Sequence, residues 1–150
     1  MTAILIAPSF CLVENTGAEE GTRRGVGMTH SIWIAVGAVL GFLAVALGAF
    51  GAHGLKSRIS ADLLVTFETG AKYQMYHALA LVLVGILANH LTSPLLDWSG
   101  RLFLAGVFLF SGSLYLLVFT NVKAFGAVTP IGGLCFMAGW ILLALAAFRV

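Results

Sequence analysis

The chain has 150 residues, of which 60% are hydrophobic and 9% are charged, and its formal net charge is +2. Soluble domains carry about 25% charged residues, and a small soluble domain cannot hide so much apolar surface from water. The composition therefore excludes an ordinary soluble domain. The low charge and the lack of a long basic run exclude a nucleic-acid-binding protein. The partner expected for this surface is the lipid bilayer.

The first 27 residues are expected to stand apart from the membrane domain. Residues 1–13 are apolar but short, contain Pro8 and lack the basic start of a secretory signal. Residues 14–27 are polar and rich in glycine, which is typical of a disordered segment. Because Met28 resembles a natural start, the sequence predicts a disordered leader or a mis-assigned start over residues 1–27. The membrane domain then covers residues 28–150.

Four apolar stretches are long enough to cross about 30 Å of hydrocarbon as helices. They cover residues 32–52, 73–91, 102–119 and 128–148. Trp33 and Trp98 stand near the ends of these stretches, where amphipathic rings prefer to lie. Trp140 lies in the middle of the last stretch and is expected to face another helix. The predicted fold is all-α, a bundle of four transmembrane helices in a multi-pass membrane protein.

The longest connection, residues 54–72, joins the first two spans. Ser60 is a suitable N-cap for a helix within it. We predict a short interfacial helix that runs into the second span after a bend at Gly70. A solvated loop is the alternative. The prediction depends on four apolar residues that recur at helical spacing, namely Ile59, Leu63, Phe67 and Ala71.

Small residues on the first span predict how the helices pack. Helix association in lipid depends on close packing, and small residues let two backbones approach each other. The spacing of these residues places them on one face of the span and indicates a tight bundle. The helix-packing residues are Gly37, Gly41, Ala44, Gly48 and Gly51.

Polar side chains at membrane depth are costly and are therefore candidates for function. His53 ends the first span, and His77 lies one turn inside the second, four residues after Tyr73. If successive helices alternate in direction, the polar residues of all four spans meet near one membrane border. The candidate functional cluster consists of His53, Glu68, Tyr73, Gln74, His77, Ser111, Ser113, Tyr115 and Thr129.

Two interpretations of this cluster remain open. Two histidines and a glutamate could bind a metal or relay protons. The sequence has no HxxH, HExxH or CxxC spacing, no phosphate-binding loop and no GxSxG motif. The structural interpretation is that His53, Glu68 and His77 form hydrogen bonds between helices. We accordingly expect no metal, no cofactor and no catalytic residue, and an enzyme is not favoured.

Four segments carry a resemblance to a known family. They are GAFGAHGL at residues 48–55, YQMYHALA at 73–80, FSGSLY at 110–115, and TPIGG at 129–133 followed by Gly139-Trp140. Over residues 28–149 the chain resembles the small bacterial membrane proteins called domain of unknown function 423, which resemble a eukaryotic mitochondrial membrane protein. The resemblance implies a four-span protein of the inner membrane. It implies no catalytic residues.

The function expected first is a non-enzymatic bundle that associates with or assists a membrane complex, because small-residue seams are present and catalytic spacings are not. One alternative is a small oligomeric transporter or proton-coupled carrier that uses His53, Glu68 and His77. Another is a membrane enzyme that acts on a lipid or quinone through the same cluster. The protein partners expected are further copies of the chain or subunits of a membrane complex.

The orientation in the membrane depends on the leader. From Met28 onward, the positive-inside rule places the first and third connections in the cytoplasm. Including Arg23 and Arg24 makes the count of basic residues four on each side. The count from Met28 compares Lys56, Arg58, Lys72 and Lys123 on one side with Arg101 and Arg149 on the other.

Overall fold

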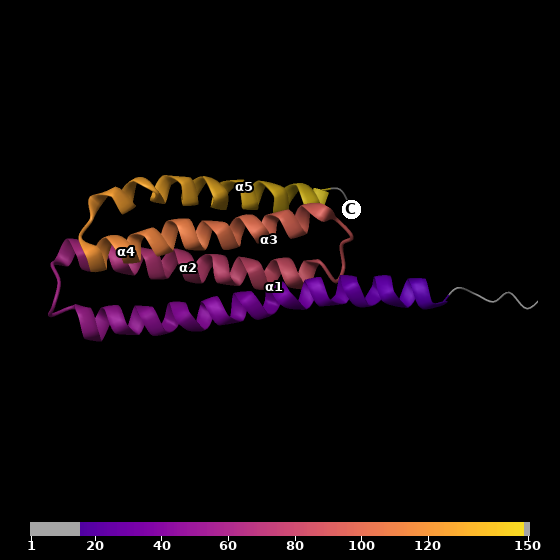
Figure 1. The fold of residues 1–150 in the computed structure, drawn as a ribbon, viewed down its shortest axis with the longest axis horizontal. Coiled ribbons are helices and arrows are strands. Elements are labelled where there is room, and N and C mark those ends of the chain that lie inside the picture. Colours follow the sequence, from indigo (N-terminus) through magenta and orange to yellow (C-terminus); the bar gives the residue numbers. More distant parts are fainter. Residues whose placement is uncertain (1–15, 149–150) are drawn as a thin grey trace, which may run out of the picture.

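The computed structural model describes the backbone of residues 16–148 and the side chains of residues 31–148. All regular structure in this range is helical (Figure 1). The α3, η2 and α4 segments follow one another without a break, so residues 16–148 form four long helical rods. In chain order the elements are α1 (Thr16–Phe50), the π-helical turn η1 (Gly51–Leu55), α2 (Ala61–Leu87), α3 (Pro94–Gly106), the π-helical segment η2 (Val107–Gly112), α4 (Ser113–Thr120), the 3₁₀ turn η3 (Lys123–Ala127) and α5 (Thr129–Phe148).

The predicted leader lies partly outside the described residues, which exclude residues 1–15. Residues 16–27, for which the sequence favoured disorder, are helical backbone in α1. Whether residues 1–27 form a leader or a mis-assigned start stays a prediction.

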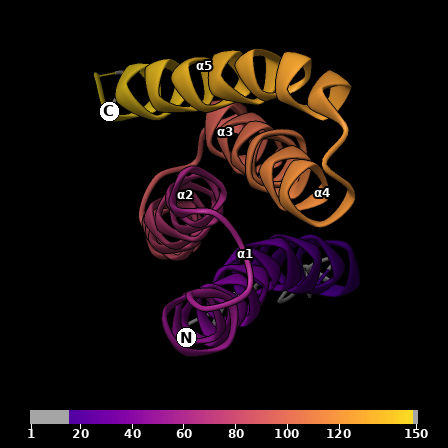
Figure 2. The ribbon, with the colours of Figure 1, turned by 90° about the vertical axis from the view of Figure 1, so that its left-hand side faces the viewer.

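The rods pack in the order α1, α2, α3–α4 and α5 (Figure 2). α1 packs mainly along α2, and α5 packs mainly on α3 and η2. The larger apolar core includes the fully buried side chains Leu81, Val84 and Phe103, so it lies where α2 meets α3. A smaller core around Phe67 fills the end of the bundle near η1. α2 is therefore an inner helix that joins α1 to the other rods.

The start of α2 confirms the predicted cap but shows no separate interfacial helix. The Ser60 hydroxyl accepts a hydrogen bond from the Leu63 amide at 3.4 Å, and Asp62 lies in the first turn. α2 then runs unbroken through Gly70, where the sequence predicted a bend. The Tyr115 ring of α4 occupies this position, 2.9 Å from where a Gly70 Cβ would lie. The glycine thus admits a neighbouring side chain, and it does not interrupt the helix.

Within the described residues, three helical stretches have the length and composition to cross a membrane: Ser31–Leu55, Pro94–Thr120 and Lys123–Phe148. The predicted span at residues 73–91 corresponds to the second half of α2, which ends at Leu87. α2 has 27 residues, or about 40 Å of helix. It is less apolar than the others because Lys72, Gln74 and His77 lie in its middle. The helix that contains the predicted third span also begins earlier than expected, at Pro94, because Ser93 caps it and the proline fits its first turn.

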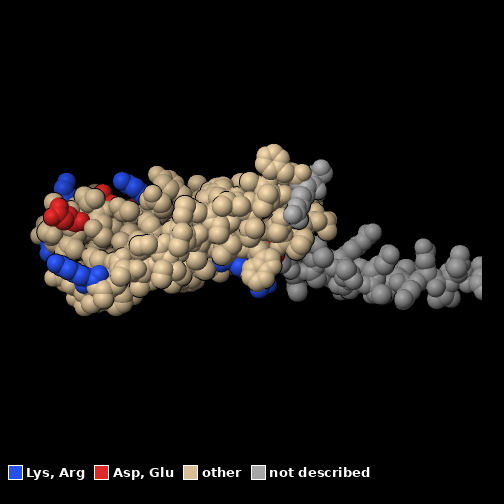
Figure 3. Space-filling view, turned by 90° about the horizontal axis from the view of Figure 1, so that it is seen from above, with Lys and Arg blue, Asp and Glu red and all other residues tan. Residues whose placement is uncertain are grey.

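Charged side chains gather near the two ends of the bundle and leave its middle uncharged on the face shown in Figure 3. The end that contains η1, the start of α2 and η3 carries Lys56, Arg58 and Lys123. Arg101 lies toward the other end, on α3. This distribution is typical of a protein whose middle lies in hydrocarbon.

Candidate functional site

His77 is the most enclosed ionisable side chain of the predicted cluster. Its Nδ1 lies 2.8 Å from the Tyr73 carbonyl oxygen, and its Nε2 lies 3.3 Å from the indole nitrogen of Trp140. An indole N–H can only donate, so Nε2 accepts, and the proton of the neutral imidazole sits on Nδ1 and donates to Tyr73. Both ring nitrogens are therefore engaged, and the bond to Trp140 joins α2 to α5. The expectation that Trp140 faces another helix is confirmed.

Aromatic rings surround the imidazole. The Phe136 ring stacks on it with centroids 3.4 Å apart and planes 6° apart, and Phe103 lies 5.6 Å away. Phe136 can reach this position because its ring occupies the space that a Cβ on Gly106 would need. The His77 ring is thus held by packing as well as by hydrogen bonds.

A cavity of about 580 Å³ opens beside His77, between α2 and α5. Tyr76 and Met137 on its rim are each 57% exposed, so the cavity is open at the surface of the bundle. We call it the α2–α5 groove. It is lined by Tyr73, Tyr76, His77, Phe110, Pro130, Gly133, Phe136, Met137 and Trp140.

Gln74 forms a second polar centre, one that links three helices. Its Nε2 donates to the Leu40 carbonyl of α1 at 2.9 Å, and its Oε1 accepts from the Tyr115 hydroxyl of α4 at 3.0 Å. Gln74 is buried, so both ends of its amide are satisfied within the protein. This arrangement fixes the positions of α1 and α4 on α2.

The predicted serines and threonine divide into one bonded pair and one isolated hydroxyl. The Ser113 hydroxyl donates to the Phe110 carbonyl at 2.9 Å, so Thr129 donates its own hydroxyl to Ser113 at 2.9 Å. This pair joins α4 to the start of α5. The Ser111 hydroxyl is fully buried and has no partner among the described residues.

The remaining two members of the predicted cluster do not meet His77. His53 is exposed in η1 and Glu68 is partly exposed on α2, and neither forms a hydrogen bond or ion pair with another described residue. Glu68 also forms no ion pair with Lys72, the described residue four positions after it on α2. Within the described part of the chain, no group of three histidine, cysteine or acidic side chains could hold a metal. A functional role for His53 or Glu68 stays a prediction.

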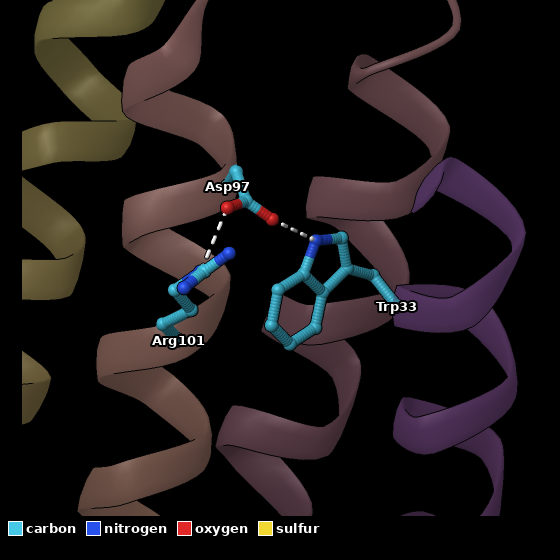
Figure 4. A network of polar contacts seen from close by, with 3 residues as sticks. All are labelled: Trp33, Asp97 and Arg101. Atoms are coloured by element: carbon cyan, nitrogen blue, oxygen red, sulfur yellow. Dashed lines mark hydrogen bonds and ion pairs between the residues drawn. The ribbon is translucent and has the colours of Figure 1, made fainter. Parts of the chain in front are cut away.

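The sequence did not predict the polar network at the other end of the bundle. The Trp33 indole N–H donates to one Asp97 oxygen at 3.2 Å, and Arg101 binds the other at 2.7 Å (Figure 4). The Trp33 ring lies over Gly100, where a Cβ would come within 2.7 Å of it. The four-residue spacing of Asp97 and Arg101 was the only signal of this network in the sequence. Nothing in the sequence indicated that Trp33 reaches α3.

Most of the predicted helix-packing residues face α2. A Cβ on Gly37 would lie 2.7 Å from the Ala78 carbonyl oxygen, and one on Gly51 would lie 3.1 Å from the Phe67 ring. Gly41 approaches Ala78, and Ala44 is buried. Gly48 differs, since nothing lies within 4 Å of the position of its Cβ. The seam therefore serves contacts within the chain, except at Gly48.

Known proteins share both the sequence and its membrane character. The family described as "Protein of unknown function (DUF423)" matches residues 47–133. The chain is 48% identical to UPF0382 membrane protein SAB0533 of Staphylococcus aureus (strain bovine RF122 / ET3-1), over 79% of this chain and 96% of that protein. It is 45% identical to UPF0382 membrane protein YwdK of Bacillus subtilis (strain 168), over 79% of this chain and 97% of that protein. No solved structure matches. The chain therefore belongs to the DUF423 family of uncharacterised membrane proteins, as its sequence motifs predicted.

Proposed function

We propose that the protein is a four-span, non-enzymatic bundle of the bacterial inner membrane that associates with a larger membrane complex through the outer face of α1. The observation that carries this proposal is the sparse packing of α1. Only 22% of its apolar window is buried within the chain, compared with 39% for the α3–α4 rod. The outer face carries large apolar side chains such as Phe42 and Val45. On the small-residue seam, the position at Gly48 is also left open by the chain itself.

The polar side chains support a structural role for the bundle. His77, Gln74 and Ser113 each form a hydrogen bond to another helix of the same chain. A general acid or base needs a free group within reach of its substrate. A proton path needs groups close enough to pass a proton, but His53 and Glu68 contact neither each other nor His77 among the described residues. We therefore favour assembly over catalysis or transport.

The four-span count rests on α2. Its length of about 40 Å exceeds the hydrocarbon thickness of about 30 Å. The positive-inside rule then places the end with Lys56, Arg58 and Lys123 in the cytoplasm. Single cysteines in place of Ser57 and Thr92, in a background without Cys11 and Cys135, test this arrangement with an impermeant maleimide. Labelling of both from the same side would show that α2 does not cross the membrane.

Native mass spectrometry of the protein, extracted in mild detergent from its own membrane, tests the association. We expect a stoichiometric complex with other subunits, lost in Gly48→Leu because the new side chain fills a position on α1 that this chain itself leaves open. Gly133→Leu is the matched control, since its Cβ also meets nothing within 4 Å but lies in the α2–α5 groove. A wild-type protein without other subunits would overturn the association, and a complex that survives Gly48→Leu would overturn the role of α1.

A further inference from the structure

We propose that the α2–α5 groove binds one acyl chain of an anionic phospholipid, whose phosphate lies beside Lys72. This inference concerns a different surface from the association face on α1. It combines three observations on the groove, namely its shape, its lack of free polar groups at depth and the charge at its outer end.

The shape of the groove suits a single chain. Its volume of about 580 Å³ falls within the range of about 300–1,000 Å³ that is typical of small-molecule sites. On α5 the lining extends from Pro130 to Trp140, ten residues or about 15 Å along the helix. A helix with its side chains is about 10 Å wide, so a flexible hydrocarbon chain fits this space better than a helix from a second copy.

The chemistry of the lining suits hydrocarbon at depth. Phe136, Met137 and Gly133 present apolar surface to the groove, and the polar atoms of His77 and Trp140 bond to each other. A ligand with a carbonyl group beside His77 and Trp140, such as a quinone ring, would find the donors of these two residues already engaged. An acyl chain needs none, because its association depends on packing alone.

The outer end of the groove suits a phosphate. Lys72 precedes Tyr76 by one helical turn, so the two share a face of α2. Helical side chains point toward the N-terminus, and a long lysine extends toward the interface, which directs the ammonium group toward the outer end of the groove. The hydroxyl groups of Tyr73 and Tyr76 have no hydrogen-bond partner among the described residues. They are available to the ester and phosphate oxygens of a lipid.

The charges around this end favour an anionic lipid over a zwitterionic one. Lys72 forms no ion pair with a described residue, although Glu68 lies one turn before it. α5 also begins at this end, so the positive end of its dipole lies near the headgroup. Four basic residues outnumber two acidic ones on this side of the described chain: Lys56, Arg58, Lys72 and Lys123 compared with Asp62 and Glu68.

Native mass spectrometry with added lipids tests the proposal on the purified full chain. The probes are phosphatidylglycerol and phosphatidylethanolamine with the same acyl chains, added at equal concentrations in a nonionic detergent. We expect the wild-type protein to retain one phosphatidylglycerol molecule in preference to phosphatidylethanolamine. Gly133→Leu should lower this retention at least tenfold, because its side chain enters the groove from an open position. Gly48→Leu, the matched substitution on α1, should bind like the wild type.

A second variant keeps the test decisive if Gly133→Leu does not fold. Lys72 is exposed, so Lys72→Gln should fold normally, bind both lipids and lose the preference for phosphatidylglycerol. Equal retention by Gly133→Leu and the wild type would overturn the groove as the site. A preference that survives in Lys72→Gln would overturn the phosphate contact. A lipid-free dimer would show that a second copy covers the groove. None of these outcomes depends on the association proposed for α1.

Discussion

The α1–α2 and α3–α5 pairs reach close packing in two different ways. Along α1–α2 a small residue lets two backbones meet, since a Cβ on Gly37 would lie 2.7 Å from the Ala78 carbonyl oxygen and 2.9 Å from the Val82 amide nitrogen. Between α3–η2 and α5, aromatic rings enter spaces left by glycines on the facing helix. Phe103 lies over Gly139, and Phe136 lies over Gly106.

This difference shows what each glycine contributes. In the first pair the small residues lie on one helix and form a periodic seam, so a single stretch of sequence reveals them. In the second pair the ring and its space belong to different helices, and only the packed structure shows which ring occupies which space. The α1–α2 interface depends on the absence of side chains. The α3–α5 interface has one close backbone approach as well, of Gly132 to Phe110, but it depends further on aromatic rings. We therefore expect loss of a ring to weaken the α3–α5 interface and addition of a methyl group to weaken the α1–α2 interface.

Loss of an aromatic ring between α3 and α5 should produce the largest change in the free energy of unfolding. Phe136→Ala removes a buried side chain that fills the space over Gly106 and stacks on His77. We expect it to lower the free energy of unfolding by about 3–5 kcal/mol, the usual cost of emptying such a site. Phe108→Ala is the control, because this ring is 65% exposed and its loss should change stability by less than about 0.5 kcal/mol. Unfolding by sodium dodecyl sulfate in mixed micelles measures the free energy of unfolding of both variants. Similar losses for Phe136→Ala and Phe108→Ala would contradict the packing described for Phe136.

Addition of a methyl group between α1 and α2 should lower the free energy of unfolding by a smaller amount. Gly37→Ala places a Cβ against the backbone of α2, and we expect this overpacking to cost about 1–3 kcal/mol. Gly48→Ala adds the same group where nothing lies within 4 Å, so the better helix propensity of alanine should raise stability by up to about 1 kcal/mol. The same unfolding experiment compares them. Effects of the same sign would show that the seam is not a close contact.

Loss of the hydrogen bond between Gln74 of α2 and Tyr115 of α4 should give the smallest change in the free energy of unfolding. A double-mutant cycle with Gln74→Leu and Tyr115→Phe removes the hydrogen bond between the two side chains. We expect a coupling energy of about 0.5–2 kcal/mol, in the range of interhelical bonds in membranes. Tyr76→Phe serves as the control, because its hydroxyl has no partner among the described residues. A coupling near zero would mean that the Gln74–Tyr115 hydrogen bond does not help to hold the two pairs together.

The candidate site was only partly predictable from the sequence, because contacts between residues on different helices are visible only in the packed structure. Residue type and membrane depth selected His77, Gln74 and Tyr115, since polar groups within a span need partners. Expected membrane depth also assigned His53 and Glu68 to this cluster. In the structure, neither forms a hydrogen bond or ion pair with another described residue. Membership in the cluster depended on the direction in which each side chain leaves its helix.

The sequence by itself determined that this is a helical membrane protein and where most of its helices lie. Composition and the length of apolar stretches are local properties, and they suffice for both conclusions. Tertiary structure alone decided that Trp140 donates to His77, that Trp33 reaches Asp97 and that a groove opens between α2 and α5. Each of these depends on how helices far apart in the chain are rotated against one another, and packing fixes that rotation.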